Sequence, residues 1–138
     1  MPFGPKHPWF ATSTDRLIVM HFSRAPTTDE ARAVTAAIAA FLEKKPSPCP
    51  WLVEMSDTAE IGASQRKVFA DNEERISSLS KQHVTRLAYV VSKPIVRAAL
   101  TAYFWMFKPP YPYRLFSARG PAEAWALGMT MRIESHPF

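Results

Sequence analysis

Histidine, cysteine and glycine are the residue types that metal sites and phosphate-binding loops would use, and their spacing in this chain argues against both. Metal sites need His, Cys or carboxylate ligands at short, defined spacings. The four histidines are far apart and lack such clustered partners: His7, His21, His83 and His136. The four glycines, at positions 4, 62, 120 and 128, are too widely separated to form a loop around a phosphate or a dinucleotide. The sequence therefore predicts no metal site and no cofactor.

Serine-based catalysis is not indicated either. A hydrolase serine sits in a tight strand-turn-helix motif with flanking glycines, and no serine here has that setting. His83 is expected to end a helix, where the backbone dipole favours a positive charge. Asp57 follows a predicted strand, either as a turn carboxylate or as a ligand contact at the carboxyl end of the sheet. We predict that the chain is not an enzyme.

Two basic residues, Lys93 and Arg97, lie in the first turn of an apolar helix predicted up to Phe107. This position near the ends of neighbouring strands makes them candidates for binding an anion. The alternative is that both side chains extend along the apolar surface into solvent, or pair with a nearby carboxylate.

The same helix carries the run Tyr103-Phe104-Trp105-Met106-Phe107. Successive residues on a helix point about 100° apart, so five consecutive large side chains cannot all enter one core. We predict that the remainder forms an interface with a partner, a second copy of the chain or a ligand. Its candidate residues are Arg97, Tyr103, Phe104, Trp105 and Phe107. Alternatively, the helix is sandwiched between the sheet and the proline-rich segments.

A chain of 138 residues with 47% apolar and 21% charged residues has the size and composition of one globular domain. Its net charge of +5 is scattered, which argues against nucleic-acid binding. Cys49 is the only cysteine, so an intrachain disulfide is excluded and a reducing compartment is favoured. No secretion signal is apparent, and charges interrupt the apolar stretch 87–107, so no transmembrane segment is predicted. We expect a cytoplasmic protein.

Strand and helix patterns alternate along the chain. Strands are predicted over 9–13 and 16–22 as an N-terminal hairpin, then over 51–55, 86–91 and 113–117. Helices are predicted from Thr27, over 64–83, over 95–107 and after Gly120-Pro121, the first with a Thr27–Glu30 capping box. This order predicts an α/β fold with a mostly parallel sheet of four to five strands, about four helices, and the opening strand antiparallel at an edge. A proline-rich segment (1–8), one domain (9–131) and a tail (132–138) complete the expected organisation.

Three stretches carry a resemblance to a known family: 52–57 with the loop that follows, 88–97, and 116–127. Together with the order of the elements, they resemble the STAS-like (SpoIIAA-like) family, typified by the bacterial anti-sigma factor antagonists and related to the lipid-binding Sec14 fold. The resemblance covers about 9–127.

In the antagonists, the loop after the central strand ends in Asp-Ser-Ser-Gly, and a partner kinase phosphorylates the second serine. Aligning Asp57 with the family's aspartate brings Ser64 onto that position, although Gly62, Ala63 and Gln65 replace the rest of the motif. Ser64 is therefore a candidate phosphorylation site, with a helix N-cap as the alternative role.

The resemblance implies a bacterial, non-enzymatic interaction or signalling module. We expect it to bind a protein partner or to form a homodimer through the aromatic helix. The alternative, suggested by the same aromatic residues and by the Sec14 relationship, is a carrier of an apolar or lipid-like ligand.

Overall fold

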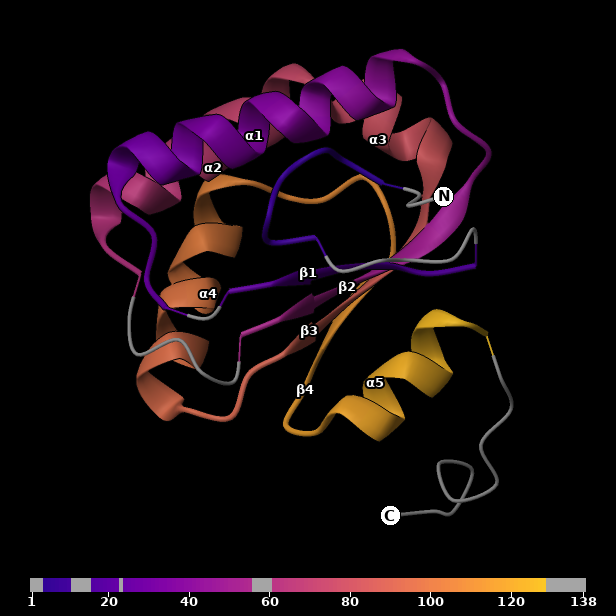
Figure 1. Ribbon diagram of the computed structural model, residues 1–138. Coiled ribbons are helices and arrows are strands. Elements are labelled where there is room, and N and C mark those ends of the chain that lie inside the picture. Colours follow the sequence, from indigo (N-terminus) through magenta and orange to yellow (C-terminus); the bar gives the residue numbers. More distant parts are fainter. Residues whose placement is uncertain (1–3, 11–15, 23, 56–60, 129–138) are drawn as a thin grey trace.

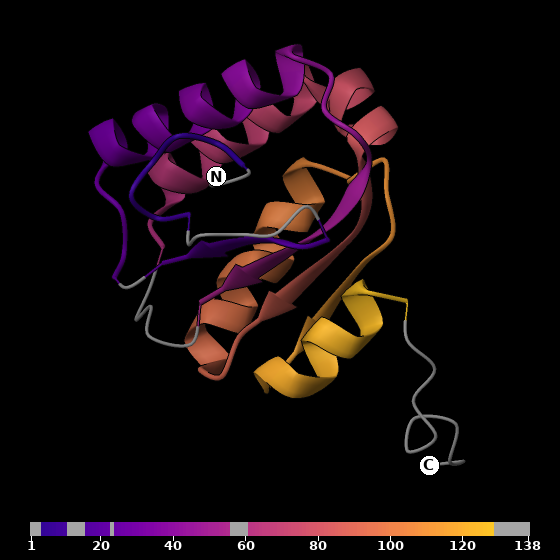
Figure 2. The same cartoon turned by 45° about the vertical axis from the view of Figure 1, so that its right-hand side comes forward.

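A four-stranded parallel sheet with helices on both faces organises the chain (Figures 1 and 2). The structure is a computed structural model that describes residues 4–10, 16–22, 24–55 and 61–128. In chain order the elements are β1 (Ile18–His21), α1 (Thr28–Glu43), β2 (Cys49–Glu54), α2 (Ala63–Arg75), α3 (Ser77–His83), β3 (Val84–Val90), α4 (Pro94–Met106), β4 (Tyr113–Phe116) and α5 (Arg119–Ala126). The strands lie in the order β1-β2-β3-β4, each parallel to its neighbour. The predicted α/β fold is confirmed.

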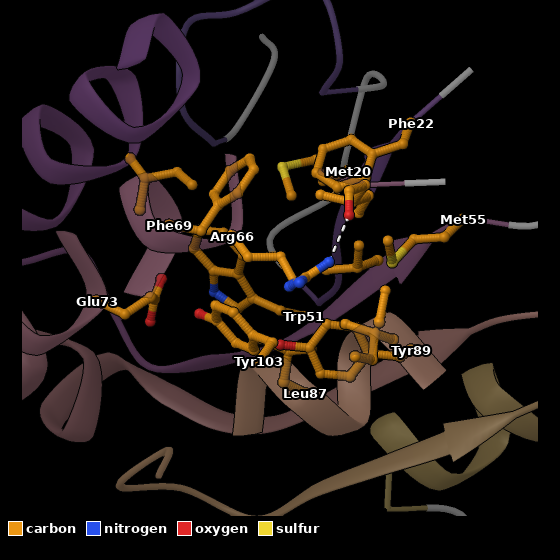
Figure 3. A pocket seen from close by; sticks show the side chains of 15 residues that line it. Met20, Phe22, Trp51, Met55, Arg66, Phe69, Glu73, Leu87, Tyr89 and Tyr103 are labelled. Atoms are coloured by element: carbon orange, nitrogen blue, oxygen red, sulfur yellow. Dashed lines mark hydrogen bonds between the residues drawn. The ribbon is translucent and has the colours of Figure 1, made fainter. Parts of the chain in front are cut away.

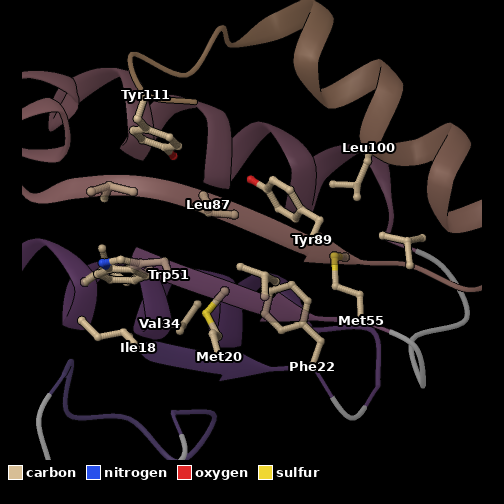
Figure 4. Packing of buried hydrophobic residues seen from close by; sticks show 14 of the residues in the cluster. Ile18, Met20, Phe22, Val34, Trp51, Met55, Leu87, Tyr89, Leu100 and Tyr111 are labelled. Atoms are coloured by element: carbon tan, nitrogen blue, oxygen red, sulfur yellow. The ribbon is translucent and has the colours of Figure 1, made fainter. Parts of the chain in front are cut away.

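The two faces of the sheet are covered unequally because alternate residues of each strand point to opposite sides. One face packs against α1, α2 and α4 and forms the larger core, which includes Met20, Trp51, Tyr89 and Leu100 (Figure 4). The other face, including Leu52, packs mainly against α5.

The predicted start of α1 is confirmed in detail. Thr27 is the N-cap, and its hydroxyl accepts a hydrogen bond from the Glu30 amide at 3.1 Å. The Glu30 carboxylate in turn accepts one from the Thr27 amide at 2.9 Å. This capping box satisfies two amides that a helix start otherwise leaves without partners.

Two helix starts differ from the prediction. Ser64 is not an N-cap, because Gly62 takes that position and α2 begins at Ala63. Ser92 is not the cap of α4, since Lys93 precedes Pro94 and has extended backbone angles. A residue before proline is kept out of the helical region by the proline ring, so the helix begins at the proline itself.

The long helix predicted over 64–83 is two helices rather than one. Ile76 separates α2 from α3 with a non-helical φ of −105° and ψ of 18°, and its side chain is buried in the core. After this break α3 turns toward the start of β3 (Figure 1).

The predicted N-terminal hairpin is represented by an isolated antiparallel bridge between Phe10 and Met20. The His21 amide donates to the Trp9 carbonyl at 2.8 Å and holds this segment against β1. Residues 11–15 of the predicted hairpin lie outside the described residues.

Candidate functional site

A cavity of about 70 Å³ lies between the sheet and the helices α1, α2 and α4 (Figure 3). Its walls are largely apolar and aromatic. They include Phe22 after β1, Phe69 on α2, Leu87 on β3 and Leu100 on α4. A few polar side chains also line it. An apolar enclosure with a small number of converging polar groups is typical of sites for small molecules.

Two nitrogen atoms in the cavity lining are buried and lack a hydrogen-bond acceptor among the described residues. They are Nε1 of Trp51, on β2, and Nε of Arg66, on α2. Arg66 uses another nitrogen, Nη1, to donate to the Ile61 carbonyl at 2.6 Å (Figure 3). Buried polar groups without partners cost about 1–3 kcal/mol each and are rare in folded proteins. Two residues of the cavity lining therefore carry donors that an acceptor group in the cavity would satisfy.

A carboxyl group and three tyrosines lie at or beside the same cavity. The Tyr111 hydroxyl donates to the Glu73 carboxylate at 3.3 Å, and Glu73 points toward Trp51 and Tyr103 (Figure 3). Burial raises the pKa of Glu73 from 4.5 to about 7, although the Tyr111 hydrogen bond acts in the opposite direction. Burial, together with the nearby Glu73 charge, also raises the pKa of Tyr89 and of Tyr103. The cavity thus combines fixed donors with a carboxyl group that titrates near neutral pH.

The local sequence explains why these side chains meet. Arg66, Phe69 and Glu73 are spaced by three and four residues, so they share one face of α2. Register places Trp51 beside Leu87 and Val53 beside Tyr89, which directs all four side chains to the face below α2. Sequence reasoning missed this site because α2 is a polar helix with few apolar residues. The signal was the i, i+3, i+7 spacing of an arginine, an aromatic residue and a glutamate.

The predicted anion-binding and phosphorylation residues lie away from the cavity. Lys93 and Arg97 are exposed at the start of α4 and do not line it. Ser64 is exposed in the first turn of α2, where its hydroxyl donates to the Gln65 side-chain oxygen at 3.3 Å. Asp57 lies outside the described residues. Anion binding and phosphorylation at these positions stay predictions.

The predicted aromatic interface is divided between the interior and the surface. Tyr103 and Phe107 are buried, and Tyr103 lines the cavity. Phe104 is half-buried, with its ring centroid 4.3 Å from that of Tyr113 on β4. Trp105 is 83% exposed. The helical period therefore turns only Trp105, with Ile95 and Met106, to the outer face of α4.

A cysteine and a histidine that are far apart in the sequence are neighbours in the core. Sγ of Cys49 lies 3.7 Å from Nε2 of His83, and Nδ1 of His83 lies 3.3 Å from the Pro46 carbonyl. His83 ends α3 as predicted. The residue is only 3% exposed, and burial lowers the pKa of its imidazole, which disfavours the positive charge that a helix end would favour. The rings of Phe41 and Trp51 pack against it. We interpret this pair as part of the core.

Within the described ranges, no group of three or more His, Cys, Asp or Glu side chains is placed to hold a metal ion. Over those same residues, no helix has both the length and the apolar character needed to cross a membrane.

Comparison with known proteins gives a family and a fold. The model of the SpoIIAA-like family matches residues 17–127. A similar solved structure is that of an uncharacterized protein of the DUF3478 family with a SpoIIAA-like fold from Shewanella loihica PV-4. Its TM-score is 0.58 at 13% identity, and the match covers 85% of this chain and 90% of that one. No curated protein matches the sequence significantly.

Proposed function

Because the chain belongs to the SpoIIAA-like family, we propose that it is a non-enzymatic binding module of that fold, which carries a small amphipathic ligand in the cavity beneath α2. The observation that carries the proposal is the pair of buried donors without acceptors in the described ranges, Trp51 Nε1 and Arg66 Nε, on two residues that line one largely apolar cavity. A bound ligand with acceptor atoms would remove the cost of both groups.

A cavity-filling substitution tests this proposal. Ala99 lines the cavity from α4, so Ala99→Phe should occupy the space and abolish binding while adding apolar contacts. Ala98→Phe is the matched control, because Ala98 is exposed on the same helix and does not line the cavity.

The measurement is mass spectrometry of the extract from purified protein, followed by titration of the stripped protein with small acids and their neutral analogues. We expect the wild type and Ala98→Phe to bind, and Ala99→Phe not to bind. Equal binding by all three proteins, or binding by none, would contradict the proposal.

A second function, self-association, is favoured by the outer face of α4. Trp105, Ile95 and Met106 are exposed there, and large aromatic and methionine side chains are enriched in protein interfaces. Sedimentation equilibrium should then give a dimer that Trp105→Ser converts to a monomer without loss of folding. A wild type that stays monomeric at high micromolar concentration would refute this function.

Signalling through Ser64 is a third element of the proposal. Its exposed hydroxyl in the first turn of α2 is accessible to a kinase, and a phosphate there would be favoured by the free amides of the helix start. Intact-mass analysis of native protein from cells grown under several conditions should detect the phosphate. We place the protein in a bacterial cytoplasm, where the lone Cys49 would remain reduced.

A further inference from the structure

The chemistry of the ligand can be inferred from the two donors of the cavity lining that have no acceptor in the part of the chain that the structure describes. Among the described residues, Arg66 is the only cationic side chain that lines the cavity, and none of their carboxylates forms an ion pair with it. The Arg66 side chain as a whole is half-exposed, but its Nε is buried without an acceptor from these residues, and a hydrogen bond from this charged donor is strongest to an anionic acceptor. Glu73 lies in the same lining but bonds to Tyr111 rather than to Arg66.

The second unpaired donor, Trp51 Nε1, limits which head group the ligand can carry. The Trp51 side chain is 4% exposed, and its N–H can only donate. A neutral alcohol or amide could accept from both donors, but its hydrogen bond from the cationic Arg66 would be weaker than that of an anion. One carboxylate offers two acceptor oxygens and a full negative charge, which suits both donors.

The volume of the cavity and its apolar walls limit the size and the remaining chemistry of the ligand. At about 10–15 Å³ for each water-sized group, a cavity of about 70 Å³ has room for about five to seven non-hydrogen atoms. The remaining walls are apolar, so the rest of the ligand must be hydrocarbon. A second negative charge, as on a phosphate dianion or a dicarboxylate, would lie in the same cavity as the Glu73 carboxyl and would be disfavoured.

We propose that the cavity binds a short-chain monocarboxylic acid as its anion, with Arg66 Nε and Trp51 Nε1 donating to the carboxylate and the hydrocarbon part held by the aromatic walls. This inference rests on the proposed ligand-binding function. It adds the class of ligand and the two residues that recognise its head group.

Nuclear magnetic resonance of the ¹⁵N-labelled full chain tests the assignment at the low affinity expected for so small a ligand. The probes are isovalerate and isovaleramide, which match in size and shape and differ in charge. Isovalerate should saturate the protein and shift the indole proton of Trp51 downfield, with the signal assigned from Trp51→Phe. Isovaleramide should bind at least about tenfold more weakly, because hydrogen bonds to a charged acceptor are the stronger ones.

Variants on α2 identify the donor. Arg66→Gln should weaken isovalerate binding at least about tenfold and weaken isovaleramide binding by a much smaller factor, because the hydrogen bond to a neutral acceptor is the weaker one. Lys67→Gln is the control, because Lys67 is the next residue, carries the same charge and pairs with Asp71 on the exposed side at 3.1 Å. It should bind isovalerate as the wild type does. If Arg66→Gln fails to fold, the comparison of the two probes on the wild type still decides.

Two other outcomes separate the inference from the function on which it rests. Equal affinity for isovalerate and isovaleramide, blocked by Ala99→Phe, would overturn the carboxylate assignment and keep the ligand-binding function. No binding of either probe would overturn both.

Discussion

Replacing Glu73 by Gln should make the protein more stable at pH 8 and leave its stability almost unchanged at pH 4.5. In the folded chain burial raises the pKa of this carboxyl from 4.5 to about 7. The groups that face it are Tyr111, Tyr103 and Tyr89, with Arg66 elsewhere in the same cavity. The glutamine keeps an acceptor for the Tyr111 hydroxyl and carries no charge at any pH.

The size of the effect follows from proton linkage. Below pH 4.5 both the folded and the unfolded chain hold the proton, so the raised pKa costs nothing. As the pH rises toward 7, the unfolded chain releases the proton while the folded chain retains it, and the free energy of unfolding falls. Each pKa unit is worth about 1.4 kcal/mol, so the full loss in the free energy of unfolding is at most about 3.5 kcal/mol and is complete above the folded pKa of about 7.

Urea unfolding followed by tryptophan fluorescence at pH 4.5, 6 and 8 measures this. Glu73→Gln should gain about 2–3 kcal/mol over the wild type at pH 8 and differ by less than about 0.5 kcal/mol at pH 4.5. Glu74→Gln is the control, because Glu74 is its exposed neighbour on α2 and should show no such trend. If Glu73→Gln changed stability equally at all three pH values, the carboxyl would not be desolvated and our account of the cavity would fail.

Three further substitutions test separate parts of the structure. Thr27→Ala removes the N-cap of α1 and should lower the free energy of unfolding by about 1 kcal/mol in urea titrations; no loss would mean that the capping box contributes nothing. Leu52→Ala removes a fully buried side chain on the α5 side of the sheet and should lower the free energy of unfolding by about 3–4 kcal/mol. Isovalerate binding at 5 °C should be unchanged, because the cavity lies on the opposite face of the sheet. Trp105→Ser, compared with the wild type at a protein concentration at which both are monomeric, should change the melting temperature by less than about 2 °C, since the residue is 83% exposed. A large drop under these conditions would mean that the Trp105 ring packs on its own chain.

Local sequence patterns were sufficient for the sheet and for the start of α1. The core strands could be predicted because β2 and β3 are nearly continuous apolar runs, as expected for strands covered on both faces. The Thr27–Glu30 pair depends only on residues three apart, so its geometry is encoded locally.

The features that escaped prediction depend on contacts between distant segments. Ile76 breaks a predicted helix over 64–83 that contains no glycine or proline to mark a break. The break becomes apparent only when the Ile76 side chain is placed in the core. Arg66 and Trp51 come from separate elements, and their shared lack of acceptors cannot be read from either stretch alone. His83 was expected to end a helix, and it does, but its burial against Phe41 and Trp51 depends on packing between distant segments.

The unequal covering of the sheet has a consequence for the order of events during synthesis. The face that carries Leu52 and Ala88 is closed mainly by α5, whose Ala122 and Ala126 allow a close approach. Since α5 follows all four strands in the chain, a ribosome-bound intermediate with β1 to β3 assembled would still present an apolar surface on that side. Exposed apolar surface of this kind is what chaperones bind. The intermediate would be released from them only when α5 emerges from the ribosome and packs on the sheet.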